Sequence, residues 1–334
     1  MTDVSRSSLL NAKLAALARP HLAVEPVPAD FPGGGALIAG DGAWLLLDAD
    51  PVTSFGPALV WADRQGAAEV HLVVPAGDAR VIARRASCFA PAPFVWAMEG
   101  TGLVEVRAAA GDWAPPAAAA APELAQLLVD ADIEVLVEDG IVRGEVLGLE
   151  VARIVHGTTS TGEPIDEPLL EVGVGQADRE LTGMLHAGLS PVDKLARVIE
   201  IVRAHRRPDA PPHPLNQLVP ERWLRARLVA DPARVGLRAL RPAPAAIPRA
   251  NLRDKGVAMA QGVAEDGRPV VVACSVGIDL DLVPAAADAR LLLDPEADLL
   301  VAIPERDAHP VTRALAARLR QPATVVPLDG DWRR

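Results

Sequence analysis

The sequence predicts an α/β fold in which two related hairpin–helix–strand–helix–strand units flank an α+β middle segment. Three observations predict it. The stretches 40–100 and 265–330 both run turn, apolar strand, amphipathic helix, apolar strand ending in proline, second helix and apolar strand. Asp-Gly pairs separate apolar runs at three places, which favours hairpins because glycine readily adopts positive φ. The chain between the two stretches lacks this order, so we expect it to form a segment of its own.

The two stretches align through their turns and strand ends, which indicates an internal duplication. The matching positions are Asp41 with Asp266, Pro75 with Pro304, and Gly100 with Gly330. The offset between partners drifts by about five residues, as insertions in loops would produce. Sequence identity is low, so a chance resemblance between two ordinary α/β units stays open as the alternative.

The first third of the chain divides into three parts. Residues 1–31 are expected to form an N-terminal amphipathic helix and lead-in, and residues 32–112 the first repeat. In that repeat, Asp78 is placed to cap a helix, since aspartate accepts hydrogen bonds from the first turn. Residues 113–123, rich in proline and alanine, are expected to be a linker because paired prolines interrupt helices and central strands.

The middle and last thirds hold three further segments. Residues 124–206 read as acidic strands around the turn Asp139-Gly140, then a polar mobile loop over 156–168, another strand, and two helices over 177–185 and 190–207. Ser190, followed by proline, is the expected N-cap of the second helix. Residues 207–255 read as a basic, proline-rich connector with one helix over 221–230, and residues 256–334 form the second repeat.

Charge is distributed unevenly along a chain whose formal net charge is −11. Residues 130–171 carry eleven acidic and two basic side chains, whereas residues 203–255 carry twelve basic and four acidic ones. Two interpretations follow. The two segments pair with each other, or residues 203–255 present a basic surface to an acidic protein or nucleic acid. No apolar run approaches the roughly 20 residues of a membrane span, so no membrane partner is expected.

The two cysteines, Cys88 and Cys274, lie in different repeats and in apolar runs. Two isolated cysteines make neither a disulfide framework nor a zinc site, so we expect buried free thiols. A reducing, cytoplasmic location fits this usage. The absence of tyrosine and the abundance of alanine, arginine and proline are typical of a GC-rich, bacterial genome.

The strand-to-helix turns of the repeats, DADPVTSFG and CSVGIDLDLV, contain no glycine motif that would cradle a phosphate. The rhythm from VVVACSVGIDLDLV to VVPLDG resembles the second half of the restriction-endonuclease-like (PD-(D/E)xK) nuclease fold. That resemblance implies acidic residues that hold a divalent metal and a lysine that steadies the attacking water. At the matching place stand Ala273, Cys274 and Ser275, which supply neither. The resemblance therefore implies a degenerate nuclease-like scaffold.

Two groups of carboxylates are candidates for metal chemistry. Asp48 and Asp50 lie two residues apart and share a face if the strand continues, although Asp50 before a proline equally suits a helix cap. Glu145, Glu150 and Glu171 lie on the acidic strands and are the candidate catalytic residues. Glu145 and Glu150 differ in parity and are expected on opposite sides of one strand, with Glu150 meeting Glu171 across a ladder. The alternative is that these are solvated strand faces.

Two further groups are candidates for binding. In the basic segment, arginines suited to phosphate accompany a tryptophan suited to stacking. These residues are Arg206, Arg207, Arg222, Trp223 and Arg225. The alternative is that the tryptophan anchors its helix on a core while the arginines pair with carboxylates. After a buried strand, a second group can exchange protons, or simply cap a helix and pair internally. Its members are Glu305, Arg306, Asp307 and His309.

Together these features favour a non-catalytic binding or scaffold protein on degenerate nuclease-like domains. One alternative is a hydrolase or nuclease that uses the middle carboxylates with a divalent metal. Another is a small-molecule-binding protein with its site between the repeats. No cofactor is predicted, and Mg²⁺ or Mn²⁺ enters only under the hydrolase alternative.

Overall fold

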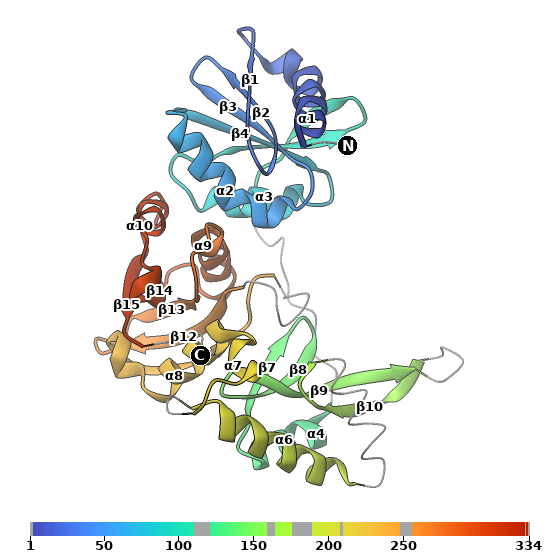
Figure 1. The fold of residues 1–334 in the computed structure, drawn as a ribbon, viewed down its shortest axis with the longest axis vertical. Helices are drawn as coiled ribbons and strands as arrows, with labels where there is room; N and C mark the ends of the chain where they lie inside the picture. The colour runs from blue at the N-terminus through green and yellow to red at the C-terminus, as the bar shows by residue number, and fades with distance from the viewer. Residues whose placement is uncertain are drawn as a thin grey trace. The chain divides into compact units, whose positions relative to one another are not determined.

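The computed structural model is an α/β protein with three sheets, which confirms the predicted fold class (Figure 1). It describes residues 3–109, 121–158, 164–175, 189–207, 210–247, 256–330 and 332. The chain divides into two compact units. Unit 1 comprises residues 1–113, 279–291 and 309–325, and unit 2 comprises residues 114–278, 292–308 and 326–334. Most of the predicted linker and the predicted helix over 177–185 lie outside the described residues.

Unit 1 is built on a six-stranded sheet in the order β1-β2-β3-β4-β5-β6. Its strands are β1 (Val27–Ala29), β2 (Gly34–Ala39), β3 (Gly42–Leu47), β4 (Glu69–Pro75), β5 (Phe94–Glu99) and β6 (Gly102–Glu105). Neighbours pair antiparallel except β3 with β4 and β4 with β5, which are parallel. Parallel pairs need a crossover, and helices provide both. These are α2 (Pro51–Arg64) and α3 (Ala79–Ser87).

Helices cover both faces of the unit 1 sheet. The N-terminal helix α1 (Asp3–Ala18), predicted from the sequence, packs Leu10 and Leu14 against Trp44 and Leu46 of β3. Figure 1 shows α1 on one side of the sheet and α2 with α3 on the other. Every residue of β3 is buried. A strand covered on both faces reads as a continuous apolar run, which explains the sequence AWLLL.

Two segments from late in the chain complete unit 1. The residues just before α9 (Leu282–Leu293) approach α2 at Gly56, where an added Cβ would lie 2.0 Å from the Leu280 carbonyl oxygen. The chain after α10 (Pro310–Ala317) forms an antiparallel bridge between Phe89 and Leu319. Because Gly56 has no side chain, these distant segments come into backbone contact.

Buried ion pairs reinforce this packing in unit 1. Arg84 Nε lies 2.5 Å from Asp288 Oδ1, and Arg85 Nη1 lies 2.7 Å from Asp281 Oδ2. Arg85 Nη1 also donates to the Val52 carbonyl oxygen at 2.8 Å. Burial raises the pKa of Asp281 to about 7, although the Arg85 guanidinium opposes the shift. The arginines come from the first repeat and the carboxylates from the second.

Unit 2 contains a four-stranded antiparallel sheet in the order β10-β9-β8-β7. Its strands are β7 (Glu134–Glu138), β8 (Ile141–Val146), β9 (Leu149–Thr158) and β10 (Pro164–Val172). Helices α4 (Pro122–Asp130) and α6 (Pro191–His205) pack on one face, where Leu128 and Val202 meet Val142 and Val146. The Ser190 hydroxyl accepts the Asp193 N–H at 3.1 Å, so the predicted cap of α6 is confirmed.

The polar stretch 156–168 is not the loop we predicted where the structure describes it. His156 pairs with Pro168 and Thr158 with Pro164, so β9 and β10 extend into this stretch, with a register shift between Pro164 and Pro168. Prolines are tolerated there because β10 is an edge strand, where a missing N–H breaks no ladder.

The second sheet of unit 2 has the order β11-β12-β13-β14-β15. Its strands are β11 (Leu237–Ala243), β12 (Ala258–Ala264), β13 (Pro269–Cys274), β14 (Asp298–Pro304) and β15 (Thr324–Leu328). The connector predicted over 207–255 therefore contributes a strand as well as the helices α7 (Pro214–Gln217) and α8 (Pro220–Ala230). Pro242 in β11 hid the strand, and its position at the sheet edge explains why proline is accepted.

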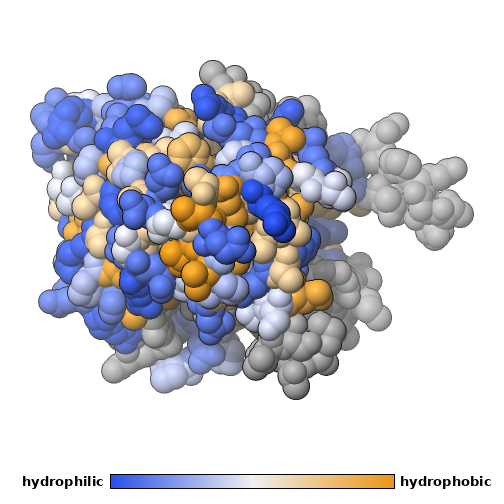
Figure 2. All heavy atoms as spheres, turned by 90° about the horizontal axis from the view of Figure 1, so that it is seen from above, coloured by the Kyte–Doolittle hydropathy of each residue, from blue (hydrophilic) through white to orange (hydrophobic). Residues whose placement is uncertain are grey.

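The two predicted repeats have the same order of elements. Within their predicted bounds, strands β2 to β5 with α2 and α3 correspond to β12 to β15 with α9 and α10, and both sheets keep their strands in chain order. The hairpins predicted at Asp41-Gly42 and Asp266-Gly267 are present in the two copies. A common origin of the repeats stays a prediction. Figure 2 shows one face of the molecule, on which apolar side chains lie in small groups among hydrophilic ones.

Candidate functional site

Three glutamates lie side by side on one face of the four-stranded sheet in unit 2. Glu134 of β7 stands opposite Glu145 of β8, and Glu145 stands opposite Glu150 of β9. Directly opposed residues of antiparallel strands point to the same face, so the three carboxylates form a row. Two of the three predicted catalytic residues are thereby brought together, and Glu134 joins them unpredicted.

The expectation that Glu145 and Glu150 face opposite sides of one strand is wrong. The chain reverses at Leu147-Gly148, where φ is +49° and +75°, so the two glutamates lie on different strands. A Cβ on Gly148 would lie 2.2 Å from the carbonyl oxygen of Arg222. The tight turn therefore brings the β8–β9 hairpin directly against α8.

Two arginines of helix α8 contact the row of glutamates. Arg222 bonds to Glu145 and, at 2.7 Å, to Glu138 of β7. Arg225 bonds to the other oxygen of Glu145, and its Nη2 lies 3.8 Å from Glu134 Oε2. A third arginine, Arg143 of β8, bonds to Glu150 and lies 3.6 Å from Glu138. We call these seven residues the α8 charge cluster: Glu134, Glu138, Arg143, Glu145, Glu150, Arg222 and Arg225.

The α8 charge cluster is buried, so its glutamates are not the solvated strand face considered above. Glu145 is 1% exposed, and Glu138 and Glu150 are each 4% exposed. Burial raises the pKa of the Glu145 carboxyl, but the guanidiniums of Arg225 and Arg222 outweigh it and hold that pKa below its ordinary value. The pKa of Glu134 is raised by burial, against the opposing effect of Arg225. Glu145 is therefore the ionised centre of the cluster.

Glu138, Glu145 and Glu150 accept hydrogen bonds from guanidiniums, whereas Glu134 Oε2 is buried without a hydrogen bond. A carboxylate that accepts two charge-assisted hydrogen bonds has few lone pairs left for a metal. Within the described ranges, no group of three or more His, Cys, Asp or Glu is arranged to hold a metal ion. Glu171, the third predicted catalytic residue, stands opposite Arg153 and bonds to it at 2.7 Å. It does not stand opposite Glu150.

The predicted binding residues of the basic segment are mostly inside unit 2. Trp223 is 3% exposed and Arg206 is 1% exposed, with its guanidinium 5.7 Å from the Trp223 ring centroid. Arg206 donates to the carbonyl oxygens of Leu147 and Leu218. Arg207 is exposed. The acidic and basic segments thus pair with each other, as one of the two interpretations of the charge pattern predicts.

Asp48 and Asp50 have separate structural partners. Asp48 lies 3.6 Å from Lys13 Nζ and 3.7 Å from Arg6 Nη2, both on α1. Asp50 accepts the Thr53 N–H at 3.3 Å and caps α2. The helix-cap interpretation of Asp50 is therefore confirmed.

The predicted acid–base group after β14 lies in a short 3₁₀ helix, Glu305–Asp307, and the residues that follow it. Asp307 is buried and its Oδ2 accepts the Gly277 N–H at 2.6 Å. His309 Nδ1 accepts the Val311 N–H at 3.2 Å and caps α10, a role the sequence suggested for Asp307. Glu305 and Arg306 lie in the 3₁₀ helix and are exposed.

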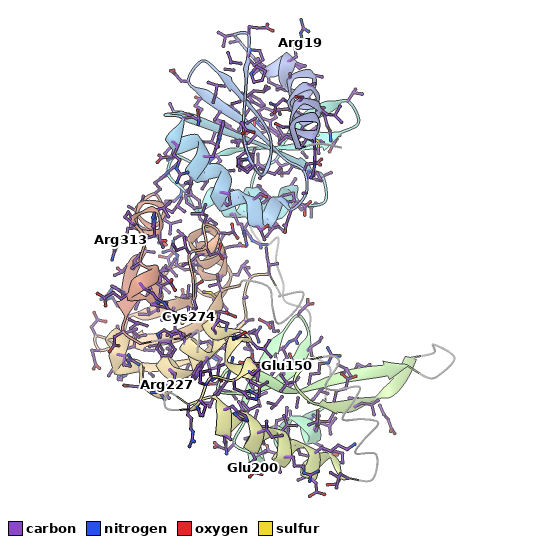
Figure 3. The ribbon with its side chains drawn as sticks, viewed as in Figure 1. Arg19, Glu150, Glu200, Arg227, Cys274 and Arg313 are labelled. Carbon is purple, nitrogen blue, oxygen red and sulfur yellow. The ribbon has the colours of Figure 1, made fainter. Side chains whose placement is uncertain are left out.

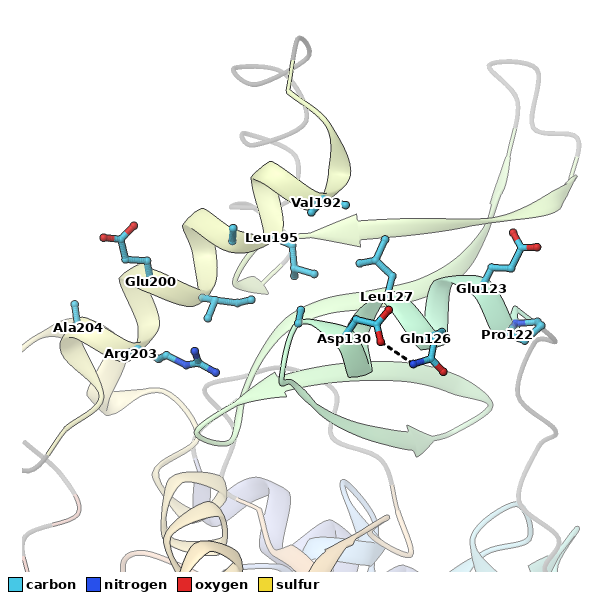
Figure 4. A pocket seen from close by; sticks show the side chains of 13 residues that line it. Pro122, Glu123, Gln126, Leu127, Asp130, Val192, Leu195, Glu200, Arg203 and Ala204 are labelled. Atoms are coloured by element: carbon cyan, nitrogen blue, oxygen red, sulfur yellow. Dashed lines mark hydrogen bonds between the residues drawn. The ribbon is translucent and has the colours of Figure 1, made fainter.

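An open groove lies on the opposite face of the four-stranded sheet, between α4 and α6 (Figure 4). It has a volume of about 1340 Å³. Figure 4 shows Leu127 of α4 and Leu195 of α6 pointing toward one another across it. We call it the α4–α6 groove, and its lining is Pro122, Glu123, Gln126, Leu127, Asp130, Ala131, Val192, Leu195, Ala196, Ile199, Glu200, Arg203 and Ala204.

The lining follows one face of each helix. On α6 it recurs at steps of three and four residues from Val192 to Ala204, and on α4 from Glu123 to Ala131. This is the spacing of a stripe that faces a partner. The stripe on α6 is only partly used inside the protein, because Val192 is 54% exposed and Ala196 is exposed. The periodicity was visible in the sequence, but nothing in it distinguished an open stripe from a buried one.

Searches with this chain against protein-family models, curated proteins and solved structures returned no similar protein. Among the helices that the structure describes, none has both the length and the apolar character needed to cross a bilayer.

Proposed function

We propose that this protein is a non-catalytic binding protein, and that the α4–α6 groove receives a helical segment of another protein. The observation that carries the proposal is the pair of matched helix faces that enclose an open, largely apolar groove. Grooves of this kind bind amphipathic helices through side chains at helical spacing. The partner completes a packing arrangement that α4 and α6 leave unfinished.

The candidate catalytic residues are engaged in ion pairs, and this supports a binding role. Glu145 and Glu150 are held by arginines, which leaves them without a free position for a metal or a reacting group. The nuclease-like scaffold stays part of the proposal, in degenerate form. At the place of its catalytic strand, Ala273 and Cys274 are fully buried and Ser275 is nearly so. Two free buried thiols suit the cytoplasm, where we place the protein.

The test uses a 14-residue amphipathic peptide with a leucine stripe and a glutamine polar face, labelled with a fluorophore. We expect saturable binding by fluorescence anisotropy. Ala196→Trp fills the groove from an exposed position and abolishes that binding. The matched control is Ile201→Trp, another exposed position of α6, which does not line the groove.

The proposal fails if the peptide does not bind, or if Ala196→Trp and Ile201→Trp bind it equally well. Circular dichroism of both variants establishes that their helices are intact. A second copy of the chain as the occupant would appear as dimerisation at sedimentation equilibrium, lost in Ala196→Trp only, and would replace the proposed partner.

A further inference from the structure

We infer that the partner helix of the α4–α6 groove is cationic as well as amphipathic. This inference rests on the proposed function and names the class of partner. It is carried by the side chains at the rim of the groove, where three carboxylates meet an apolar floor. The rim carboxylates are Glu123, Asp130 and Glu200.

The rim carboxylates are available to a partner. All three residues are exposed. Among the described residues, Glu123 and Glu200 have no hydrogen-bond or ion-pair partner, and Asp130 accepts one neutral hydrogen bond, from Gln126 Nε2 at 2.8 Å. Figure 4 shows the Glu123 and Glu200 carboxylates directed outward from their helices. They would meet the flanks of a helix that lies in the groove.

Arg203 is the cation among the described residues of the lining, and it does not neutralise the rim. Arg203 Nη2 bonds to Asp132, at 3.1 Å to the carbonyl oxygen and 3.1 Å to the carboxylate. Its charge is therefore already matched by a carboxylate outside the lining. The groove presents a net negative rim, which attracts lysine and arginine and repels acidic helices and anionic lipid surfaces.

The apolar lining of the groove determines the length of the partner helix and the spacing of its apolar residues. The accessible apolar side chains are Leu127 and Val192, whereas Leu195 and Ile199 are buried in the core. Ala196 and Ala204 leave room for a close approach two turns apart. A helix as long as α4 or α6, with nine or 15 residues, spans about 13 to 22 Å at 1.5 Å per residue. The chemistry points to one to two heptads of apolar residues, flanked by lysine or arginine.

The experiment compares three fluorescent 14-residue peptides with the same leucine stripe and a polar face of lysine, glutamine or glutamate. We expect the lysine peptide to bind about tenfold more tightly than the glutamine peptide, the combined effect of three surface ion pairs. The glutamate peptide binds more weakly still. Raising the salt concentration reduces the difference, because exposed charges are screened.

The matched variant is the triple substitution Glu123→Gln, Asp130→Asn and Glu200→Gln, which removes the rim charge and preserves the apolar floor. It is expected to bind the lysine and glutamine peptides equally. Glu265→Gln, at an exposed turn of unit 2 outside the groove, keeps the tenfold preference. Ala196→Trp must abolish binding of the lysine peptide, because otherwise that peptide binds elsewhere and the inference is overturned.

The outcomes separate this inference from the proposed function. Equal binding of all three peptides, blocked by Ala196→Trp, overturns the cationic partner and leaves the helix groove in place. A preference for the lysine peptide that survives the triple substitution also overturns it. If none of the peptides binds, both the cationic partner and the helix-binding role of the groove are overturned.

Discussion

The α8 charge cluster and the α4–α6 groove lie on opposite faces of the same four-stranded sheet. One face carries three opposed glutamates, and α8 covers it with two arginines that form buried ion pairs with Glu145. The other face carries apolar residues that α4 and α6 bury, and the two helices leave a stripe of their own residues open beside them. Figure 3 labels one member of each, Glu150 at the sheet and Glu200 on α6.

Chemically versatile side chains do not mark a functional site when buried ion pairs already engage them. A buried carboxylate costs free energy unless charge and hydrogen bonds compensate it, so a row of three demands its arginines. Leucine and alanine carry no such demand and can be left open to a partner. In this protein such residues line the groove between α4 and α6.

The largest expected effect comes from breaking the α8 charge cluster at its centre. Glu145→Ala leaves Arg222 and Arg225 buried without their shared partner, which should lower the free energy of unfolding by about 3–5 kcal/mol. Urea denaturation followed by tryptophan fluorescence measures it. Glu171→Ala removes a partly exposed pair with Arg153 and should cost at most about 1 kcal/mol. Equal losses in the two variants would refute a structural role specific to the cluster.

The next effect tests the close approach of the β8–β9 turn to α8. Gly148→Ala meets both a positive φ and the Arg222 carbonyl oxygen, whereas Gly236→Ala meets a positive φ with nothing within 4 Å. The control should cost about 1–2 kcal/mol for the left-handed backbone alone. Gly148→Ala should cost about 2 kcal/mol more because of the overlap. If the two denaturation midpoints shift alike, the hairpin does not press against α8.

A smaller effect is expected on the pH dependence of stability, at Asp281 of the unit 1 ion pairs. The pKa of Asp281 is raised to about 7, chiefly by burial, so the folded protein holds a proton that the unfolded chain releases near pH 4. The stability from this group is present below about pH 4 and is lost as pH rises through 7. Hydrogen exchange of α3 should therefore quicken more between pH 5 and 8 in the wild type than in Asp281→Asn, after correction for intrinsic rates. Identical pH dependence in the two proteins would contradict the assignment.

The sequence predicted those parts of the fold that local chemistry determines. The hairpins predicted at Asp41-Gly42, Asp139-Gly140 and Asp266-Gly267 are present. Gly140 and Gly267 supply the positive φ of their turns, whereas in the first hairpin Gly40 supplies it and Gly42 begins β3. Asp50 and Ser190 cap the helices they precede. Each of these features depends on residues that are close neighbours in the chain.

The parts that could not be predicted depend on contacts between distant residues. The row of glutamates depends on a chain reversal at Leu147-Gly148. A single glycine was too weak a sequence pattern to predict that turn. The joining of α9 to unit 1 depends on Arg84 and Asp288, more than 200 positions apart, and on an absent side chain at Gly56. The groove was missed because an apolar helix stripe looks the same whether it is covered or open.

The most direct test of the account is whether the groove is open in the free protein. Both native thiols are buried, and burial raises the pKa of Cys88 to about 11 and of Cys274 to about 12, so neither should react readily with maleimide near neutral pH. Cysteines introduced as Ala196→Cys and Ile201→Cys should both be labelled rapidly, and the lysine-faced peptide should protect only the first. Slow labelling of Ala196→Cys without peptide, at a rate like that of the native thiols, would mean that the groove is already filled and would contradict the account.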